Sequence, residues 1–348
     1  MSRFPWHSLF RRWAAKLALA VMASIAGLLL VEIGVRWLLP HYHPQAQIAF
    51  HPGPSGTHLG RLGATLRLAN TKGDFDVSVT FNALGLRDSK DLRQARPGAW
   101  FAVGDSFTMG WGVTEDERFS NLLEEQLGQP VFNVAIPTDL RGYGRLIAYA
   151  ESQGIKVSRL ILGICMENDL RDYRSAETAA PTRARPSAGT SRSRARQWLR
   201  THSAAFLAAC HELQKVPALR RGLENVGLAR DGEQWANPHV LDEAMLTSCR
   251  DEVLRLTNGR EAVVLLIPAR GLWLGTNQAT ERRVHARFAA LLRDAGLRVA
   301  DPKPSFDKSG QPLGYYFKAD PHWNSGGHQS AAAAITETLA AQRSANSP

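Results

Sequence analysis

The sequence has few cysteines, no pattern of metal ligands and no internal repeat. Its 348 residues include three cysteines, which are too few for a disulfide framework. None of them has the spacing of a metal site, and no motif indicates a cofactor, so we expect neither. Cys165 falls within an apolar run and is expected to be a small core residue. Cys210 and Cys249 lie on helix-like segments and could pair in an oxidising compartment.

The sequence also lacks a basic surface spread along the whole chain. The net charge is +10, but it is confined to two segments. Residues 1–40 hold five basic residues against Glu32, and residues 174–200 hold seven arginines against Glu177, so the remainder is neutral. Nucleic-acid binding through a general basic surface is therefore not expected.

One long apolar run is present, and it covers residues 14–39. About 20 apolar residues are enough to cross a bilayer. Glu32 and Arg36 interrupt the far end of the run at the spacing of an i,i+4 pair. Arg11 and Arg12 precede the run, so the positive-inside rule predicts a cytoplasmic N-terminus with the bulk of the chain on the other side.

A cleaved signal peptide is the alternative interpretation of the same run. No small-x-small cleavage site stands out after it, and the segment 37–40 (Trp-Leu-Leu-Pro) is more typical of an interfacial belt. We therefore expect an uncleaved anchor over residues 1–40.

Residues 41–98 are expected to form a stalk and an appended β-hairpin. Residues 41–63 are rich in Pro, Gly and His, which is typical of a stalk. Residues 65–70 and 74–82 alternate apolar and polar side chains, which predicts two strands joined around Lys72-Gly73.

Short apolar strands then alternate with amphipathic helices over residues 99–342. This pattern predicts a doubly wound parallel sheet covered by helices on both faces. The expected strands are 99–103, 130–136, 159–165, 261–268 and 298–301. The expected helices are 115–127, 142–154, 280–295 and 326–342.

An insertion at about 174–258 interrupts this pattern. Residues 174–198 are basic and of low complexity, which is typical of a solvated mobile loop or of a segment held near anionic lipid or an acidic glycan. Residues 199–258 are mainly helix-like, with 235–239 as a candidate loop over the site. A helical insert at this place fits a lid that shapes the substrate site.

Three blocks carry candidate chemistry, and each follows an expected strand. Residues 101–110 read FAVGDSFTMG and place Ser106 at a strand-to-helix turn. Residues 161–169 read ILGICMEND and end in Asn168. Residues 318–328 read KADPHWNSGGH and place Asp320 two residues before His322. Together they supply a nucleophile, an oxyanion donor, an orienting carboxylate and a base.

With these blocks in this order, the chain resembles the SGNH (GDSL-type) hydrolase superfamily. The resemblance is closest to its membrane-anchored bacterial members, which also carry a Glu-x-x-x-Arg near the end of an N-terminal helix. They share an Asn-x-x-Gly-x-Arg segment before the serine block, here Asn82 to Arg87. The resemblance implies a three-layer α/β/α flavodoxin-like sheet and a periplasmic domain anchored in the bacterial inner membrane.

The expected roles follow from chemistry and from the resemblance together. Ser106 would be the nucleophile, and His322, neutral near pH 7, would take its proton. Asp320 would hold the other ring nitrogen of His322. Many superfamily members use Asp-x-x-His, whereas this chain has Asp-x-His. His328 is expected to be a surface histidine before the closing helix.

The resemblance implies an oxyanion hole built from the Ser106 N–H, an N–H in a second block and the Asn168 side chain. The second block, residues 133–139, places Thr138 where the family has glycine. Threonine retains the N–H but does not adopt positive φ cheaply. Asp105 and Asp169 are expected to organise loops. Two tryptophans, Trp111 and Trp323, could wall an acyl or sugar pocket or belong to the core.

The sequence therefore predicts a serine ester hydrolase with an acyl-serine intermediate. By analogy with the family, its substrate would be a small molecule or a glycan ester, with short acyl groups such as acetyl on envelope or exported glycans. Thioesterase or lysophospholipase activity stays open, because the resemblance implies a triad that serves these leaving groups too, and two further alternatives stay open with it. The same triad could serve a glycan O-acetyltransferase, or the domain could be a catalytically silent glycan-binding module.

Overall fold

The computed structural model describes residues 6–42, 48–70, 72–171, 173, 198–199, 202–214, 216, 219 and 242–345. The chain divides into two compact units. One consists of Met1–Ala46 with Pro186–Asp231, and the other of Gln47–Arg185 with Gly232–Pro348.

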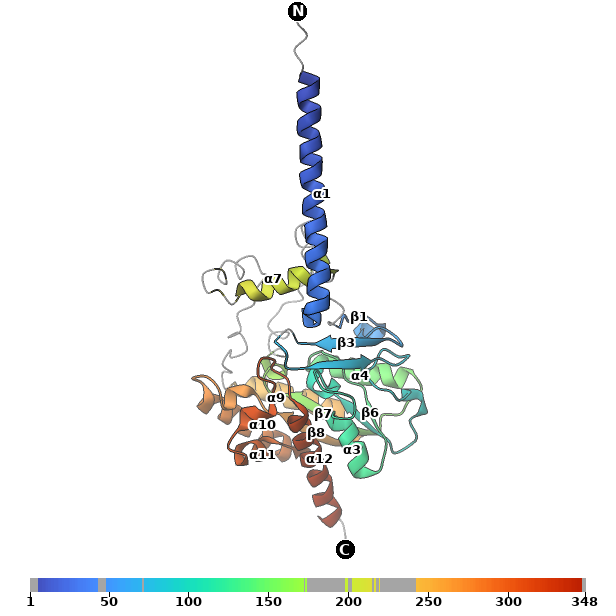
Figure 1. The fold of residues 1–348 in the computed structure, drawn as a ribbon. Helices are drawn as coiled ribbons and strands as arrows, with labels where there is room; N and C mark the ends of the chain where they lie inside the picture. The colour runs from blue at the N-terminus through green and yellow to red at the C-terminus, as the bar shows by residue number, and fades with distance from the viewer. Residues whose placement is uncertain are drawn as a thin grey trace, which may run out of the picture. The chain divides into compact units, whose positions relative to one another are not determined.

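The first unit contains a long helix, α1 (Trp6–Leu38), followed by the turn η1 (Pro40–Tyr42) and a shorter helix, α7 (Ala204–Gln214). Within α1, residues 13–38 have a mean hydropathy of 2.3 and are not buried by other parts of the chain, so this helix is long and apolar enough to cross a membrane. Figure 1 shows it as one uninterrupted helix.

Glu32 joins α1 to the start of α7. Its carboxylate accepts hydrogen bonds from the backbone N–H groups of Ala204 (2.9 Å) and Ala205 (3.0 Å) and from the Ser203 hydroxyl (2.8 Å). Arg36 donates to the same carboxylate at 2.7 Å, which confirms the predicted i,i+4 pair. Glu32 therefore caps the N-terminus of a helix from the insertion, where a negative charge is stabilising.

The second unit is built on a parallel sheet of five strands. In the order in which they are hydrogen-bonded, these are β6 (Val131–Asn133), β5 (Trp100–Val103), β7 (Arg159–Cys165), β8 (Glu261–Ile267) and β9 (Arg298–Ala300). All four pairings are parallel. In chain order the arrangement is 2-1-3-4-5, the flavodoxin-like order of a doubly wound fold.

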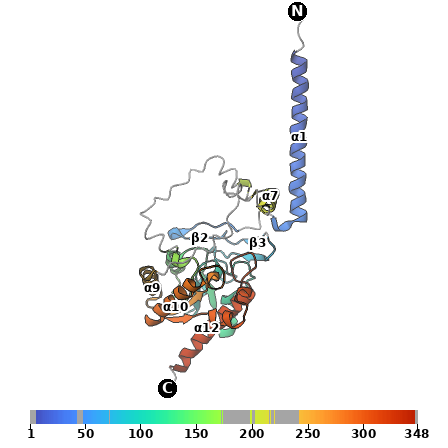
Figure 2. The same ribbon diagram turned by 90° about the vertical axis from the view of Figure 1, so that its left-hand side faces the viewer.

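Helices cover both faces of this sheet, as alternation along the strands dictates. In β5, Phe101 and Val103 face one apolar cluster, whereas Trp100 and Ala102 face the other. The first cluster includes residues of α4 (Leu140–Ser152), α9 (Glu243–Thr257) and α10 (Gln278–Asp294). The second includes residues of α3 (Phe119–Leu127), α11 (Lys303–Lys308) and α12 (Ser325–Ala345). Figure 2 shows α9 and α10 close together on one side of the unit.

The hairpin expected before the sheet is present. Strands β3 (Thr65–Ala69) and β4 (Asp76–Thr80) pair antiparallel, with Ala69 opposite Asp76 at the turn. Phe75, Val79 and Phe81 are buried against the first apolar cluster, as their alternation predicts. A smaller pair, β1 (His51–Pro52) with β2 (His58–Leu59), precedes it and encloses η3 (Pro54–Gly56). Three further 3-10 turns are η4 (Leu92–Gln94), η6 (Arg270–Leu272) and η7 (Pro312–Tyr315).

The structure differs from the predicted elements at several places. Strand β6 ends at Asn133 instead of residue 136, because the Asn133 side chain accepts the Ala135 N–H at 3.1 Å and turns the chain. A short helix, α2 (Ser106–Met109), begins at the serine itself, and α3 starts only at Phe119. Helix α11 was not expected. The basic segment 174–197 and the candidate loop 235–239 lie outside the described residues.

Candidate active site

The serine lies at a tight turn between β5 and α2. Asp105 is the N-cap of α2, and its carboxylate accepts the Phe107 N–H at 2.9 Å. Gly104 precedes it in a space where a Cβ would lie 2.1 Å from the Thr108 hydroxyl oxygen, so only glycine fits. Gly110 ends the helix in the left-handed region at φ 84°. These constraints hold Ser106 at the carboxyl edge of the sheet, with its N–H at the first residue of a helix.

The histidine comes from a closed loop before α12. Asn324 N donates to Tyr315 O at 3.0 Å, and Phe317 N donates to His322 O at 3.0 Å. Tyr316 and Trp323 form an isolated antiparallel bridge in the same loop. The loop tip, residues 318–321, therefore projects from a hydrogen-bonded base.

Ser106, His322 and Asp320 form a continuous hydrogen-bonded chain. His322 Nε2 is 2.8 Å from Ser106 Oγ, and His322 Nδ1 is 2.6 Å from Asp320 Oδ1. The His322 backbone N–H also donates to Asp320 Oδ1, at 3.0 Å. Burial alone would raise the pKa of Asp320, but the hydrogen bonds and charge of His322 outweigh it and leave the pKa below its usual value. The geometry matches a serine–histidine–aspartate triad.

Two aromatic side chains from the segment that follows Ser106 pack against the His322 imidazole. Trp111 stacks on the His322 ring, with centroids 5.6 Å apart and planes inclined by 27°. Phe107 lies 4.8 Å from the same ring at 46°. Trp323, in contrast, is fully buried and packs edge-on against Phe107, so it belongs to the core. Of the two predicted pocket tryptophans, only Trp111 lies beside the reacting groups.

The three predicted oxyanion donors come from three adjacent strands. Ser106 follows β5, Thr138 follows β6, and Asn168 follows β7, with β5 between the other two. All three residues are half-buried. Since the carboxyl ends of parallel strands meet at one edge, the donors belong to the edge that carries the triad. Their role as an oxyanion hole stays a prediction.

Asp169 organises the turn that presents Asn168. Its Oδ2 accepts the Cys165 N–H and the Tyr143 hydroxyl, both at 2.7 Å, and the residue is fully buried. Burial and the negative charge of Asp105 raise the pKa of Asp169 well above its usual value. Burial likewise raises the pKa of Asp105 to about 6, although the charge of His322 opposes the shift. Both carboxyls thus act on loops, as expected, and lie buried near the triad.

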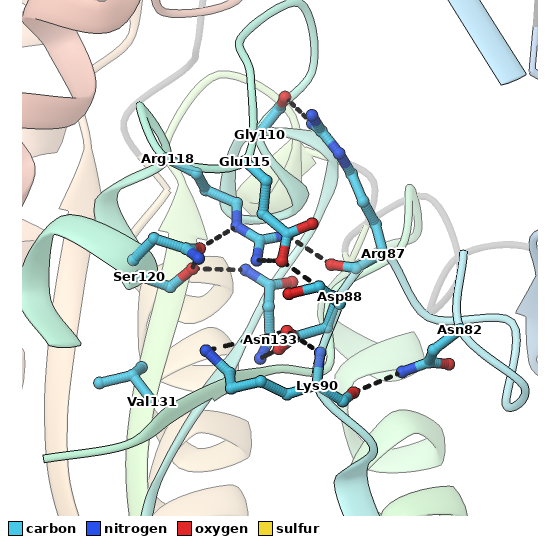
Figure 3. A network of polar contacts seen from close by, with 12 residues as sticks. Asn82, Arg87, Asp88, Lys90, Gly110, Glu115, Arg118, Ser120, Val131 and Asn133 are labelled. Carbon is cyan, nitrogen blue, oxygen red and sulfur yellow. Dashed lines mark hydrogen bonds and ion pairs between the residues drawn. The ribbon is translucent and has the colours of Figure 1, made fainter. Parts of the chain in front are cut away.

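A buried polar network holds the backbone that follows the serine (Figure 3). The Arg87 guanidinium donates to the carbonyls of Met109 (3.3 Å), Gly110 and Val113 (2.5 Å). Arg118 in turn donates to the Arg87 carbonyl. Burial, and then the charge of Arg118, lowers the pKa of Arg87 to about 9. Arg87 therefore positions the segment that carries Trp111.

Asp88 connects the same network to strand β6. Its Oδ2 accepts the Asn133 N–H at 2.7 Å (Figure 3). The Asn133 side chain donates to Thr108 O at 2.7 Å. Lys90 Nζ lies 3.8 Å from Asp88 Oδ1 and 2.5 Å from Glu124 Oε2. The sequence contains the Asn82–Arg87 motif but does not indicate this role, because the burial of Arg87 depends on the distant segment around Gly110.

One prediction about this region is wrong. His328 is not a surface residue: its exposed fraction is 1%, and its ring lies between Phe119 and Trp323. Its Nδ1 accepts the Phe119 N–H at 3.3 Å. Burial is the main cause that lowers its pKa to about 3, and the positive charges of Arg87 and Arg118 add to the effect. The imidazole is therefore neutral. His328 lies in the first turn of α12, and the sequence there does not reveal that α3 covers it.

Comparisons with known proteins agree with this architecture. Residues 241–348 match the family model described as the SGNH hydrolase-like domain of acetyltransferase AlgX. The match includes Asp320 and His322, whereas Ser106 and Asn168 lie before it. No curated protein sequence matches the chain.

Several solved structures resemble the chain at low identity. A lipolytic G-D-S-L family protein from Veillonella parvula is 11% identical, with 70% of this chain and 98% of that chain covered and a TM-score of 0.38. An acetylxylan esterase from Geobacillus stearothermophilus, solved as a catalytic mutant, is 14% identical, with 71% and 96% covered and a TM-score of 0.38. A lipase from a goat rumen metagenome is 16% identical, with 69% and 96% covered and a TM-score of 0.36.

The fold and the site define an α/β/α protein with a serine turn at the carboxyl edge of its sheet. With the family model over the histidine block, these features confirm the resemblance seen in the sequence. Over residues 241–348, the family model supports the SGNH hydrolase superfamily.

Proposed function

We propose that the chain is a serine esterase that removes short acyl groups, acetyl above all, from envelope or exported glycans. One observation carries the proposal: Ser106, His322 and Asp320 lie in a single hydrogen-bonded chain, at 2.8 and 2.6 Å. A serine hydroxyl is a weak nucleophile unless a base takes its proton, and this arrangement supplies the base and its orienting carboxylate.

The acylation step follows from these contacts. His322 Nε2 takes the proton from Ser106 Oγ while Oγ forms a bond to the ester carbonyl carbon. Asp320 holds Nδ1–H and stabilises the imidazolium that results. The oxyanion accepts hydrogen bonds from the Ser106 N–H, the Thr138 N–H and the Asn168 side chain. The intermediate then collapses, and His322 returns the proton to the departing sugar oxygen.

Deacylation uses the same groups in reverse roles. A water gives its proton to His322 Nε2 as its oxygen attacks the acyl-serine carbonyl carbon. When the second tetrahedral intermediate breaks the bond to Ser106 Oγ, His322 returns the proton to that oxygen. The products are the free acid and the unmodified serine.

Acetyl transfer to a glycan hydroxyl is the second candidate. It is favoured by the description of the matched family model, which names an acetyltransferase. The acyl-serine intermediate is shared; only the acceptor differs, because a sugar hydroxyl takes the place of water. A glycan-binding module without activity is the remaining alternative, and Thr138 at the expected glycine is its support.

The full chain in detergent, incubated with p-nitrophenyl acetate and an unmodified oligosaccharide, separates these candidates. Release of p-nitrophenol with acetate as the other product supports hydrolysis. Acetylated oligosaccharide, identified by its added mass of one acetyl group, supports transfer. A wild-type rate equal to that of Ser106→Ala would contradict both and leave the binding module.

We further propose that α1 stays attached as an inner-membrane anchor, with the second unit in the periplasm. The Glu32 carboxylate supports retention, because it satisfies two backbone N–H groups at the start of α7. Removal of α1 as a signal peptide would leave these two N–H groups without that acceptor. Intact mass of the protein from isolated membranes tests this: the full-length mass is expected, and a mass that lacks the first 40 or so residues would contradict retention.

A further inference from the structure

The appended hairpin contacts the loop that carries the catalytic aspartate and histidine. Asp74, in the hairpin turn, accepts the Ala319 N–H on Oδ2 at 2.8 Å. Ala319 directly precedes Asp320 in the sequence. Within the residues that the structure describes, this N–H has no other side-chain acceptor. The hairpin therefore reaches one residue away from the triad.

An apolar contact beside this hydrogen bond fixes the same loop. The Phe75 ring lies 4.9 Å from the Phe317 ring, with the planes at 53°. Both rings pack against Gly112, where an added Cβ would lie 2.6 Å from Phe317 and 2.7 Å from Phe75. Gly112 has φ 84° and follows Trp111, the residue stacked on His322. The hairpin, the segment after Ser106 and the loop of His322 are thus in contact at Phe75, Gly112 and Phe317.

Local contacts connect the described residues of the hairpin. Asn70 N donates to Phe75 O at 3.0 Å, and Gly73 N donates to Asn70 O at 3.0 Å. The Arg67 guanidinium pairs with the Asp76 carboxylate across the two strands. Because β3 and β4 pair over their full length and pack on the first apolar cluster, Asp74 is presented from a fixed element.

We propose that the appended hairpin is a brace for the catalytic loop and that Asp74 is a positioning residue for Asp320 and His322. The loop tip, residues 318–321, is exposed or half-buried, and its base hydrogen bonds end at Phe317 and His322. Asp74 and Phe75 supply the contacts that stop the tip from moving outward. A displacement of about 1 Å at a catalytic group can lower a rate on the order of a hundredfold, so a brace at Ala319 acts directly on the Asp320–His322 geometry.

This inference rests on the proposed serine esterase activity, and Asp74 offers a clean test of it. Asp74 is half-buried and makes no hydrogen bond to the triad side chains, so its substitution removes none of the reacting groups. Asp74→Ala removes the acceptor for the Ala319 N–H. Asp74→Asn keeps an oxygen that can accept it. Asp76→Ala is the matched control, because Asp76 lies on the same hairpin and pairs with Arg67 instead of the catalytic loop.

Each protein, as the full chain in detergent, would be assayed for kcat and KM on p-nitrophenyl acetate across pH, with hydrogen exchange of peptides over residues 315–324. For Asp74→Ala we expect kcat to fall on the order of tenfold, with KM little changed. We also expect the acidic limb of the kcat/KM profile to move to lower pH, since a displaced Asp320 stabilises the imidazolium less. Exchange at residues 318–322 should become faster, whereas Asp74→Asn should keep most of the activity and Asp76→Ala should resemble wild type.

A purely structural hydrogen bond would change the melting temperature without moving the pH profile or the exchange of the catalytic loop. If Asp74→Ala matches Asp76→Ala in kcat, in the acidic limb and in exchange, the brace is overturned. If wild type itself shows no turnover, the proposed function fails, and exchange alone decides the brace: faster exchange of residues 318–322 in Asp74→Ala supports it, and unchanged exchange rejects it.

Discussion

His322 Nε2 lies 2.8 Å from Ser106 Oγ, although 216 residues separate the two in the chain. The strand order explains how they meet. Ser106 follows the central strand β5, and the loop of His322 leads into α12, which packs on the same sheet near β8 and β9. The sheet brings a turn and a loop together at one edge, as doubly wound folds do.

Asp320→Asn should lower kcat by about a thousandfold to ten-thousandfold, because asparagine leaves the imidazole in the wrong tautomer. The reason lies in the 2.6 Å contact between Asp320 Oδ1 and His322 Nδ1. Steady-state kinetics on p-nitrophenyl acetate would measure the loss. Asp307→Asn, an exposed carboxylate on α11, is the control and should retain full activity. A loss below tenfold for Asp320→Asn would remove Asp320 from the triad.

Asn168→Ala should lower kcat by about a hundredfold to a thousandfold with little change in KM, as for loss of one oxyanion donor. Asn168 is half-buried at the end of β7, and the buried Asp169 fixes its turn. Asn277→Ala is a suitable control, because the Asn277 side chain makes no capping hydrogen bond at the start of α10. Equal kcat in Asn168→Ala and wild type would exclude the amide from the oxyanion hole.

Asp105→Asn should stabilise the protein at pH 7. Burial raises the pKa of Asp105 from 3.8 to about 6 in the folded state. The folded state therefore binds a proton that the unfolded state releases, and stability falls as pH rises from about 4 to about 6. About two pKa units correspond to a penalty on the order of 3 kcal/mol above that window. Asparagine keeps the oxygen that accepts the Phe107 N–H without the charge.

Urea unfolding of the full chain in detergent, at pH 4 and pH 7, would check this prediction. Relative to wild type, Asp105→Asn should raise the free energy of unfolding more at pH 7 than at pH 4. Asp139→Asn is the control, since Asp139 caps α4 in the same way but is half-exposed. An unchanged pH difference in Asp105→Asn would show that Asp105 does not carry the penalty.

His328 makes the opposite contribution to the pH dependence. Burial lowers the pKa of His328 in the folded state from 6.5 to about 3. As pH falls, the unfolded state is therefore protonated at a higher pH than the folded state. Its contribution is complete above pH 6.5 and decreases by about 1.4 kcal/mol per pH unit below that. Between pH 6.5 and pH 5 the contribution of His328 to the free energy of unfolding should therefore fall by about 2 kcal/mol. His328→Asn, which keeps an acceptor for the Phe119 N–H, should flatten this slope, whereas the exposed His58→Asn should not.

The sequence predicted the sheet and the three chemical blocks because both depend on local patterns. The predicted strands 159–165 and 261–268 match the observed strands to the residue or to within one residue. Ser106 and Asn168 follow strand ends, which parallel topology places at one edge. Asp320 and His322 share one short loop, so their contact needs little tertiary information.

Other features depend on which distant segments pack together, and no local pattern carries that information. The burial of His328 depends on α3, 209 residues earlier in the chain. The contact of Asp74 with Ala319 spans 245 residues. The hairpin itself was predicted from alternation, but its place beside the catalytic loop was not.

Fluorophosphonate labelling of the full chain in detergent tests the central claim most directly. The reagent reacts covalently only with an activated serine, so it reports on the Ser106–His322 contact without any assumption about the substrate. The account predicts one label on Ser106 in wild type, none in Ser106→Ala, and a large loss in His322→Ala, with hydrolysis of p-nitrophenyl acetate lost in parallel. Equal labelling or equal ester turnover in all three proteins would contradict the assignment of the triad.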